Sequence, residues 1–135
     1  MPPDRLENLV RSGALIPEPP HEAELDRMLA SATARLADAG RTDISYDSRF
    51  DLAYNAAHAF ALVALRRRRY RPRNRTIVFQ LLEETAGLPA ERWRILDVAH
   101  TRRNVAEYEG GLDEDLQLLD DLLAVTHELR DQLQR

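Results

Sequence analysis

Glycine and proline divide this sequence into long stretches that contain neither residue. The uninterrupted stretches span 21–39, 43–71, 74–86, 90–109 and 112–135. Stretches of 13 to 29 residues are too long for ordinary strands and suit helices. Leucines at spacings of three and four in the last stretch give it one apolar helical face. We therefore expect an all-α fold, an antiparallel up-and-down bundle of four or five helices joined by short connections.

The chain of 135 residues suits a single compact domain. Pro17, Pro19 and Pro20 separate a short N-terminal segment and proline-rich linker, residues 1–20, from a helical-bundle domain, residues 21–135. The absence of cysteine excludes disulfides and thiol catalysis. No apolar run approaches the roughly 20 residues of a membrane helix, and the N-terminus has no hydrophobic signal region. A cytoplasmic protein without a membrane partner is the expectation.

The stretch 43–71 is apolar on nearly every side, which predicts a central helix. Four helices can rarely cover such a helix completely, so the same pattern favours a subunit interface and a homodimer. The spacing of Ser48 and Asp51 predicts a capping box at its start. Pro89 stands just ahead of the next long helix, and Asp113 is the expected N-cap of the last one.

A polar stripe follows this apolar helix at Asp47, Asp51, Asn55 and His58. Gaps of four, four and three residues place the stripe on one helical face. One interpretation is a ligand site that combines carboxylate, amide and imidazole groups. The alternative is a solvated face, or a hydrogen-bond network within an interface.

The stretch 90–109 also carries polar side chains. Its expected core face contains Ile95, Val98, Ala99, Val105 and Ala106, and the opposite face contains Asp97, His100, Thr101, Asn104 and Tyr108. Arg102 is expected toward the middle of the apolar arc and Arg103 toward its edge. A buried guanidinium needs an acceptor, which predicts either an ion pair with a carboxylate such as Asp51 or an anion site that holds a phosphate.

Ten consecutive residues contain seven arginines around one tyrosine, Tyr70; the arginines are Arg66, Arg67, Arg68, Arg69, Arg71, Arg73 and Arg75. Such a run can neutralise several backbone phosphates while the tyrosine stacks on a base. Cations are also favoured at a helix C-terminus, and a charged connector can simply be solvated or can engage acidic surface within a dimer. Both interpretations stay open.

Metal binding has little support in the sequence. The four histidines, His21, His58, His100 and His127, lie on four different segments, and none forms an i, i+4 pair. We expect neither a metal nor another cofactor.

Two segments together resemble the HEPN superfamily of small all-α domains. The first is Arg49–Ala57, which precedes the basic run, and the second is Asp97–Tyr108. The resemblance covers roughly residues 22–130 and implies a dimer. The family signature is an arginine, usually followed by a polar residue, with a histidine four to six residues beyond the arginine. In members that are metal-independent endoribonucleases, these residues line a cleft at the dimer interface.

Arg103 matches the motif arginine and Asn104 the polar residue, whereas Tyr108 stands at the histidine position. An unperturbed phenol stays protonated near neutral pH and is a poor general base, unlike imidazole. His100 or His58 could supply an imidazole from another direction. The resemblance thus implies a non-catalytic or weakly active module of toxin–antitoxin type that binds RNA, a nucleotide or a partner protein.

The ligand or anion contacts expected on this basis are Arg102, Asn104, Asp51, Asn55 and His58. A nucleotidyltransferase antitoxin is the protein partner that the resemblance suggests. Two alternatives remain. One is a metal-independent endoribonuclease toxin that uses Arg103 with Tyr108, His100 or His58. The other is a purely structural helical module whose arginine run contacts an acidic partner.

Overall fold

The computed structural model describes residues 4–134, and this part of the chain is mostly helical. The all-α prediction is confirmed at the level of fold class. The helices are α1 (Arg5–Ser12), α2 (Glu22–Ala39), α3 (Tyr46–Arg67), α4 (Ile77–Gln80), α5 (Leu82–Ala86), α6 (Ala90–Glu109) and α7 (Leu116–Leu133). Two three-residue strands, β1 (Leu15–Pro17) and β2 (Tyr70–Pro72), complete the described secondary structure.

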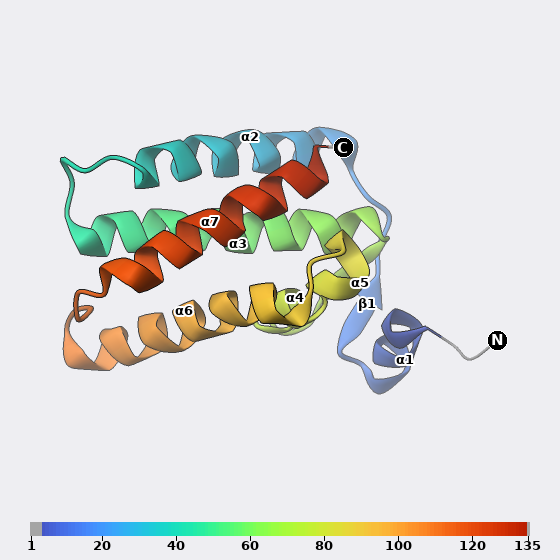
Figure 1. The fold of residues 1–135 in the computed structure, drawn as a ribbon. Helices are drawn as coiled ribbons and strands as arrows, with labels where there is room; N and C mark the ends of the chain where they lie inside the picture. The colour runs from blue at the N-terminus through green and yellow to red at the C-terminus, as the bar shows by residue number, and fades with distance from the viewer. Residues whose placement is uncertain (1–3, 135) are drawn as a thin grey trace.

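Helix α3 is central, as its apolar sequence predicts. Helices α2, α6 and α7 all contact it, and α2 and α3 lie side by side in opposite directions (Figure 1). Alanines fill much of its buried surface and let neighbouring helices approach closely, while Phe50, Phe60 and Leu65 are fully enclosed. Burial of each such large side chain is worth roughly 1.5–3 kcal/mol, so α3 organises the core.

Two of the expected helix starts are wrong by about one turn or less. The N-cap of α3 is Ser45, whose side chain accepts a hydrogen bond from the Ser48 backbone. The N-cap of α7 is Asp115, which accepts from the backbone of Leu118, and not Asp113. In both cases an earlier or later hydroxyl or carboxylate reaches the free N–H groups of the first turn. Helix α6 begins directly after Pro89, as predicted.

The stretch 74–86 contains no single helix. Leu81, with ψ near 2°, separates α4 from α5, and α5 ends at Gly87 with φ of 67°. Buried Val78, Phe79 and Leu82 hold both short helices against the core. Packing therefore decides the path of this segment more than helical propensity does.

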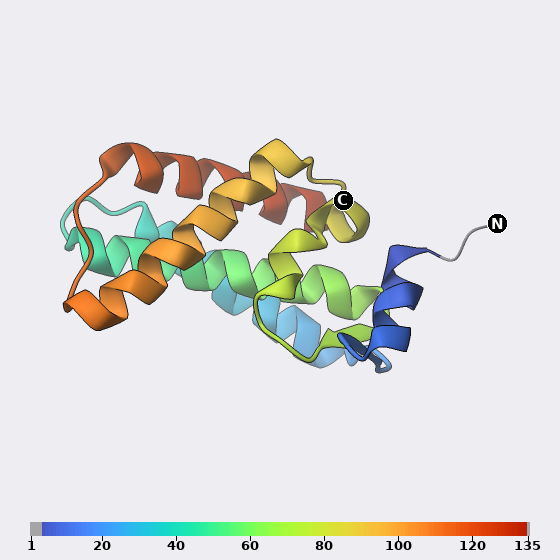
Figure 2. The same ribbon diagram turned by 90° about the horizontal axis from the view of Figure 1, so that it is seen from below.

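Residues 4–20 form α1 and β1, although the sequence suggests only a short segment and a linker. Strand β1 pairs antiparallel with β2, with Leu15 opposite Pro72 and Pro17 opposite Tyr70. Leu6 and Leu15 belong to the hydrophobic core. Seen from below, α1 and this two-stranded ribbon cover the end of α3 (Figure 2). The N-terminal segment is thus packed onto the helical domain.

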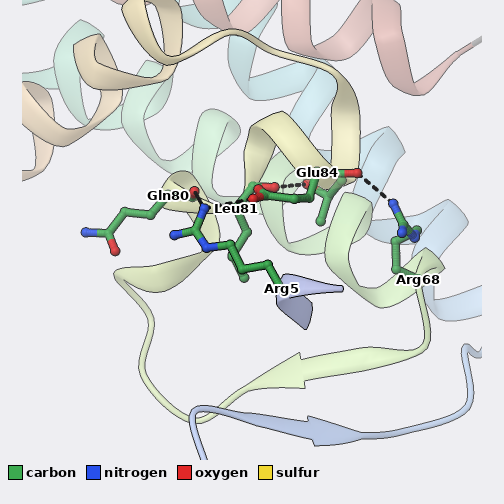
Figure 3. A network of polar contacts seen from close by, with 6 residues as sticks. Arg5, Arg68, Gln80, Leu81 and Glu84 are labelled. Carbon is green, nitrogen blue, oxygen red and sulfur yellow. Dashed lines mark hydrogen bonds and ion pairs between the residues drawn. The ribbon is translucent and has the colours of Figure 1, made fainter. Parts of the chain in front are cut away.

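A polar network joins α1 to α4 and α5, and joins the residue after α3 to α5 (Figure 3). Arg5 Nη1 donates to the Glu84 carboxylate at 2.8 Å and lies 3.4 Å from the Gln80 carbonyl. Arg68 Nη1 donates to the Glu84 carbonyl at 2.6 Å.

Within residues 4–134, no helix combines the length and hydrophobicity needed to cross a membrane.

Candidate functional site

Arg103 on α6 contacts two side chains of α3. Its guanidinium carbon lies 4.8 Å from the centre of the Tyr54 ring, within the range of a cation–π interaction. Its Nε lies 3.5 Å from Asp51 Oδ1, longer than an ordinary charge-assisted hydrogen bond. The aromatic ring therefore orients the guanidinium, while the exposed Asp51 carboxylate pairs with it only loosely.

His100 extends this cluster by one turn of α6. Its Nδ1 lies 2.6 Å from the Tyr54 hydroxyl, and its Nε2 lies 3.0 Å from Asn104 Nδ2. When the Asn104 amide donates to Nε2, the imidazole proton sits on Nδ1 and is donated to Tyr54. The phenolic hydrogen of Tyr54 is then available to another acceptor. The two helices thus build a contiguous group of Arg103, Tyr54, His100 and Asn104.

A pocket of about 260 Å³ borders Arg103. Asp47 and Asp51 line it from α3, Glu107 lines it from α6, and Gly110 and Gly111 close it from the following loop. Three carboxylates and one guanidinium make this pocket acidic. It suits ligand groups that donate hydrogen bonds, such as hydroxyls and amines.

Burial tunes the ionisable groups around the cluster. Burial raises the pKa of the Tyr54 phenol, and the positive charge of Arg103 opposes this only in part. Burial, aided by the charge of Arg75, lowers the pKa of His58 to about 4. Burial also raises the pKa of Asp97. At neutral pH, Tyr54 is therefore protonated and His58 is uncharged.

His58 is held by packing beside this cluster. Its ring meets Phe79 edge to face, with centroids 5.8 Å apart. Its Nε2 lies 3.3 Å from the Arg75 carbonyl, to which it donates as the neutral tautomer. The expected imidazole of the polar stripe is thus turned against the α4 segment.

The expected core face of α6 is wrong in part, because Ala99 is buried as predicted but the two valines are not. Leu96 and Ala99 are buried, whereas Val98 and Val105 are 47% and 44% exposed. The buried face is rotated relative to the expected one, so Arg103 lies against α3. Arg102 is the more exposed of the two arginines, and its Nη2 lies 3.8 Å from Asp115 Oδ2.

The structure therefore brings several predicted site residues together and leaves others apart. Asp51 meets Arg103, and His100 meets Asn104. Asn55 is half-buried on α3. Tyr108 is 92% exposed near the end of α6. Tyr54 could not be recognised as a site residue from the sequence, although it lies three residues after Asp51 and four before His58, because an aromatic residue in an apolar helix resembles a core residue.

Much of the arginine run has partners within the molecule. Arg66 is buried, and its Nη1 lies 2.8 Å from Glu18 Oε2, an ion pair whose angle falls outside hydrogen-bond geometry. Arg71 Nε lies 3.6 Å from the same carboxylate oxygen. Arg67 Nη1 donates to the Leu133 carbonyl at 2.6 Å, at the end of α7. These side chains tie the N-terminal segment and α7 to the end of α3.

Of the remaining arginines in the run, two have hydrogen-bond partners within the described part of the protein and two do not. Arg68 donates to the Glu84 carbonyl, and Arg73 Nε donates to the Gly13 carbonyl at 2.7 Å. Among residues 4–134, the side chains of Arg69 and Arg75 make no hydrogen bond or ion pair to the protein. Within the described part of the chain, only some arginines of the run therefore have side chains that are free to bind another molecule.

The described part of the chain holds no group of three or more His, Asp or Glu side chains arranged to bind a metal ion. Comparison of the sequence with protein-family models and curated proteins, and of the structure with solved structures, finds no match. The HEPN resemblance stays a prediction.

Proposed function

We propose that the site between α3 and α6 binds a nucleotide or RNA without efficient cleavage, and that Arg103 contacts the phosphate. The observation that carries the proposal is the state of the Arg103 guanidinium. The Arg103 guanidinium lies 4.8 Å from the Tyr54 ring, and within residues 4–134 its one carboxylate contact is the loose pair with Asp51 at 3.5 Å. Its terminal nitrogens are left to grip a phosphate, for which the planar guanidinium is well suited.

The surrounding groups favour a nucleotide over a bare phosphate. Asp47, Asp51 and Glu107 make the adjacent pocket acidic, so the phosphate must approach Arg103 from the side of His100 and Asn104. The carboxylates then face the rest of the ligand. Ribose hydroxyls and base amino groups donate hydrogen bonds and complement such acceptors.

Binding without efficient cleavage is supported by the two tyrosines of α3 and α6, because neither phenol readily accepts a proton. Metal-independent RNA cleavage needs a group that takes a proton from the ribose 2′-hydroxyl near neutral pH. Tyr54 has a raised pKa and stays protonated. Tyr108, at the position of the family histidine, is nearly fully exposed and its phenol is a poor base.

A metal-independent endoribonuclease is the second candidate. It is favoured by one observation, the 2.6 Å contact that fixes the His100 imidazole against Tyr54 one turn before Arg103. In this version His100 exchanges the proton and Arg103 stabilises the phosphate charge.

The proposal includes the assembly that the HEPN resemblance implies: a HEPN-like up-and-down bundle of four or five helices that forms a homodimer, with a nucleotidyltransferase antitoxin as protein partner. Val98 and Val105 support a protein interface on α6, because these valines lie two helical turns apart and both are exposed. Apolar side chains exposed on one helix face are typical of interfaces.

The test is binding of a fluorescein-labelled mixed RNA pool, followed by fluorescence anisotropy in EDTA, with cleavage read on gels from the same samples. The wild type is compared with Arg103→Gln and with the matched control Arg94→Gln. Arg94 is exposed on the same helix and contacts the Trp93 ring. We expect Arg103→Gln to weaken binding at least about tenfold, the value of a charge-assisted hydrogen bond, and Arg94→Gln to change it little.

The outcomes separate the candidates. RNA binding that depends on Arg103, with intact RNA, supports the binding module. Cleavage in EDTA that disappears in Arg103→Gln shows an endoribonuclease and overturns the binding-only proposal. No binding, or equal weakening by both substitutions, overturns a role for this site and leaves the structural helical module.

A further inference from the structure

A second and larger pocket, of about 580 Å³, lies where α1 and the segment after β1 meet the end of α3. This is the end of the molecule away from the loop between α6 and α7 (Figure 1). Its apolar lining comes from Val10, Pro17, Pro19 and Tyr70. The volume falls in the range of roughly 300–1,000 Å³ that small-molecule sites occupy.

Three arginines, Arg11, Arg68 and Arg69, line the same pocket. Among residues 4–134, none of the three forms an ion pair. Arg68 donates to the Glu84 carbonyl, and Arg11 makes a 3.5 Å contact with the Asn8 side chain. Cationic side chains without carboxylate partners surround the apolar surface.

The two acids of the pocket do not cancel this charge. Glu18 already faces Arg66 at 2.8 Å and Arg71 at 3.6 Å, so two cations outside the pocket lining neutralise it. Glu7 is the remaining acid and is exposed. The pocket thus keeps a positive balance beside an apolar wall.

The backbone fixes the position of Arg69. Its φ of 74° lies in the left-handed region, which a residue with a side chain rarely adopts. Two backbone hydrogen bonds hold it there. Arg69 N–H donates to the Arg66 carbonyl at 3.0 Å, and Glu18 N–H donates to the Arg69 carbonyl at 2.9 Å. The backbone of Arg69 is therefore fixed at the pocket, while its side chain makes no hydrogen bond or ion pair within residues 4–134.

We propose that this pocket binds a small organic anion built on a flat apolar ring system. The ring lies against Tyr70 and the prolines, and the anionic group, a phosphate, carboxylate or sulfonate, meets Arg69 with Arg11 and Arg68. A nucleic-acid strand does not fit this surface equally well, because a strand needs a continuous track of free cations. The neighbouring Arg66, Arg67 and Arg73 are engaged within the protein.

The probe is 8-anilinonaphthalene-1-sulfonate, an aromatic sulfonate whose fluorescence rises on binding. The full chain is titrated in its folded state, checked by near-UV circular dichroism. The matched neutral ligand is N-phenyl-1-naphthylamine, which lacks the sulfonate. We expect saturable binding of the sulfonate and binding of the neutral ligand that is at least about tenfold weaker. We also expect little displacement of the sulfonate by an equal concentration of inorganic sulfate.

The variants are Arg69→Asn and the control Arg75→Asn. Asparagine tolerates the left-handed conformation better than other residues with a side chain, so Arg69→Asn removes the charge without disturbing the backbone. Arg75 belongs to the same run, is exposed and lies outside the pocket lining. We expect Arg69→Asn to weaken probe binding about tenfold and Arg75→Asn to leave it within about twofold.

Four results would overturn the proposal. Equal weakening by both variants reduces the binding to general attraction by the arginine run. Equal binding of the neutral ligand would show that the anionic group contributes nothing to binding. Displacement by sulfate at equal concentration would show that the ring system contributes nothing. Absence of saturable binding up to about 1 mM, the range of very weak affinity, excludes the site altogether. None of these results depends on RNA binding between α3 and α6.

Discussion

Arg102 and Arg103 show how one residue step on a helix separates two chemistries. A step of one residue turns a side chain by about 100°. Arg103 thereby stacks on Tyr54 and faces Asp51, whereas Arg102 is nearly half exposed and lies 3.8 Å from Asp115. A guanidinium held on one face and open on the other is prepared to bind an anion.

His58 gives a prediction about pH. Its folded-state pKa of about 4 lies below its ordinary value of 6.5, so the unfolded chain binds the proton more tightly. The stability from neutral His58 is therefore complete above the unfolded pKa and is lost as the pH falls toward 4. Between about pH 7 and about pH 5, we expect His58 to account for a loss on the order of 2 kcal/mol in the free energy of unfolding.

Urea denaturation at both pH values, for the wild type and His58→Gln, measures this contribution. The glutamine amide can still donate toward the Arg75 carbonyl but does not titrate. The wild type is expected to lose more stability than the variant on acidification. Equal losses would show that His58 is not the responsible group.

At the scale of elements, the sequence predicts the long helices well because glycine, proline and apolar periodicity act locally. The helix start at Pro89 and the central place of α3 follow from such signals. The strands β1 and β2 could not be predicted, because three residues carry no period and their pairing joins segments about 55 residues apart. The break at Leu81 likewise comes from packing.

Some residues of the candidate site could likewise be predicted from local sequence patterns, and others could not. The polar stripe of α3 and the polar residues of α6 could be recognised in the sequence, and Asp51 and Arg103 do meet. Which arginine faces α3 depends on the rotation of α6, and exposed Val98 and Val105 made the wrong face look like core. Tyr54 was hidden by its apolar neighbours.

The end of α6 supplies a prediction from two adjacent glycines. Gly110 has φ of 86° and open space around an added Cβ, whereas a Cβ at Gly111 would make only an ordinary 3.5 Å contact with Asp47. Gly110→Ala should lower the free energy of unfolding by about 1 kcal/mol, and Gly111→Ala should change it little. Chemical denaturation compares them, and equal effects would contradict the left-handed turn.

Glu18 tests how the N-terminal segment is fastened. After Glu18→Ala, the buried Arg66 guanidinium keeps, among residues 4–134, a single 3.3 Å hydrogen bond to the Pro19 carbonyl. We expect a loss of about 2 kcal/mol in the free energy of unfolding and faster proteolysis within residues 4–20. The control is Asp43→Ala, which breaks an exposed pair with Arg41 and should have little effect. Similar effects of the two substitutions would show that the Arg66 pair is not a structural anchor.

At the scale of the molecule, α3 is surrounded by its neighbouring helices, and one face of α6 carries exposed apolar side chains. Val98 and Val105 lie on that face, while α1 and the ribbon close the far end of α3 (Figure 1). The α3–α6 site and the arginine-lined pocket are thus separate features at different places on one small fold.

The open face of α6 predicts the effect of a charge on assembly. In the proposed homodimer, Val98→Asp buries a charge in the interface and should shift the mass from twice 15.5 kDa to 15.5 kDa. Light scattering coupled to gel filtration measures the mass. Ala124→Asp, on an exposed position of α7, is the control. A monomeric wild type, or a Val98→Asp variant that remains dimeric, would contradict this interface.

Amide chemical-shift mapping shows whether a nucleotide or RNA binds between α3 and α6, as we propose. A short single-stranded RNA is titrated into the ¹⁵N-labelled protein in EDTA, and amide shifts are followed along the chain. We expect saturable shifts at residues 51–58 of α3 and 100–111 of α6 and its loop, and we expect Arg103→Gln to abolish them. Shifts confined to residues 66–75, with the α3–α6 residues unchanged, would contradict it.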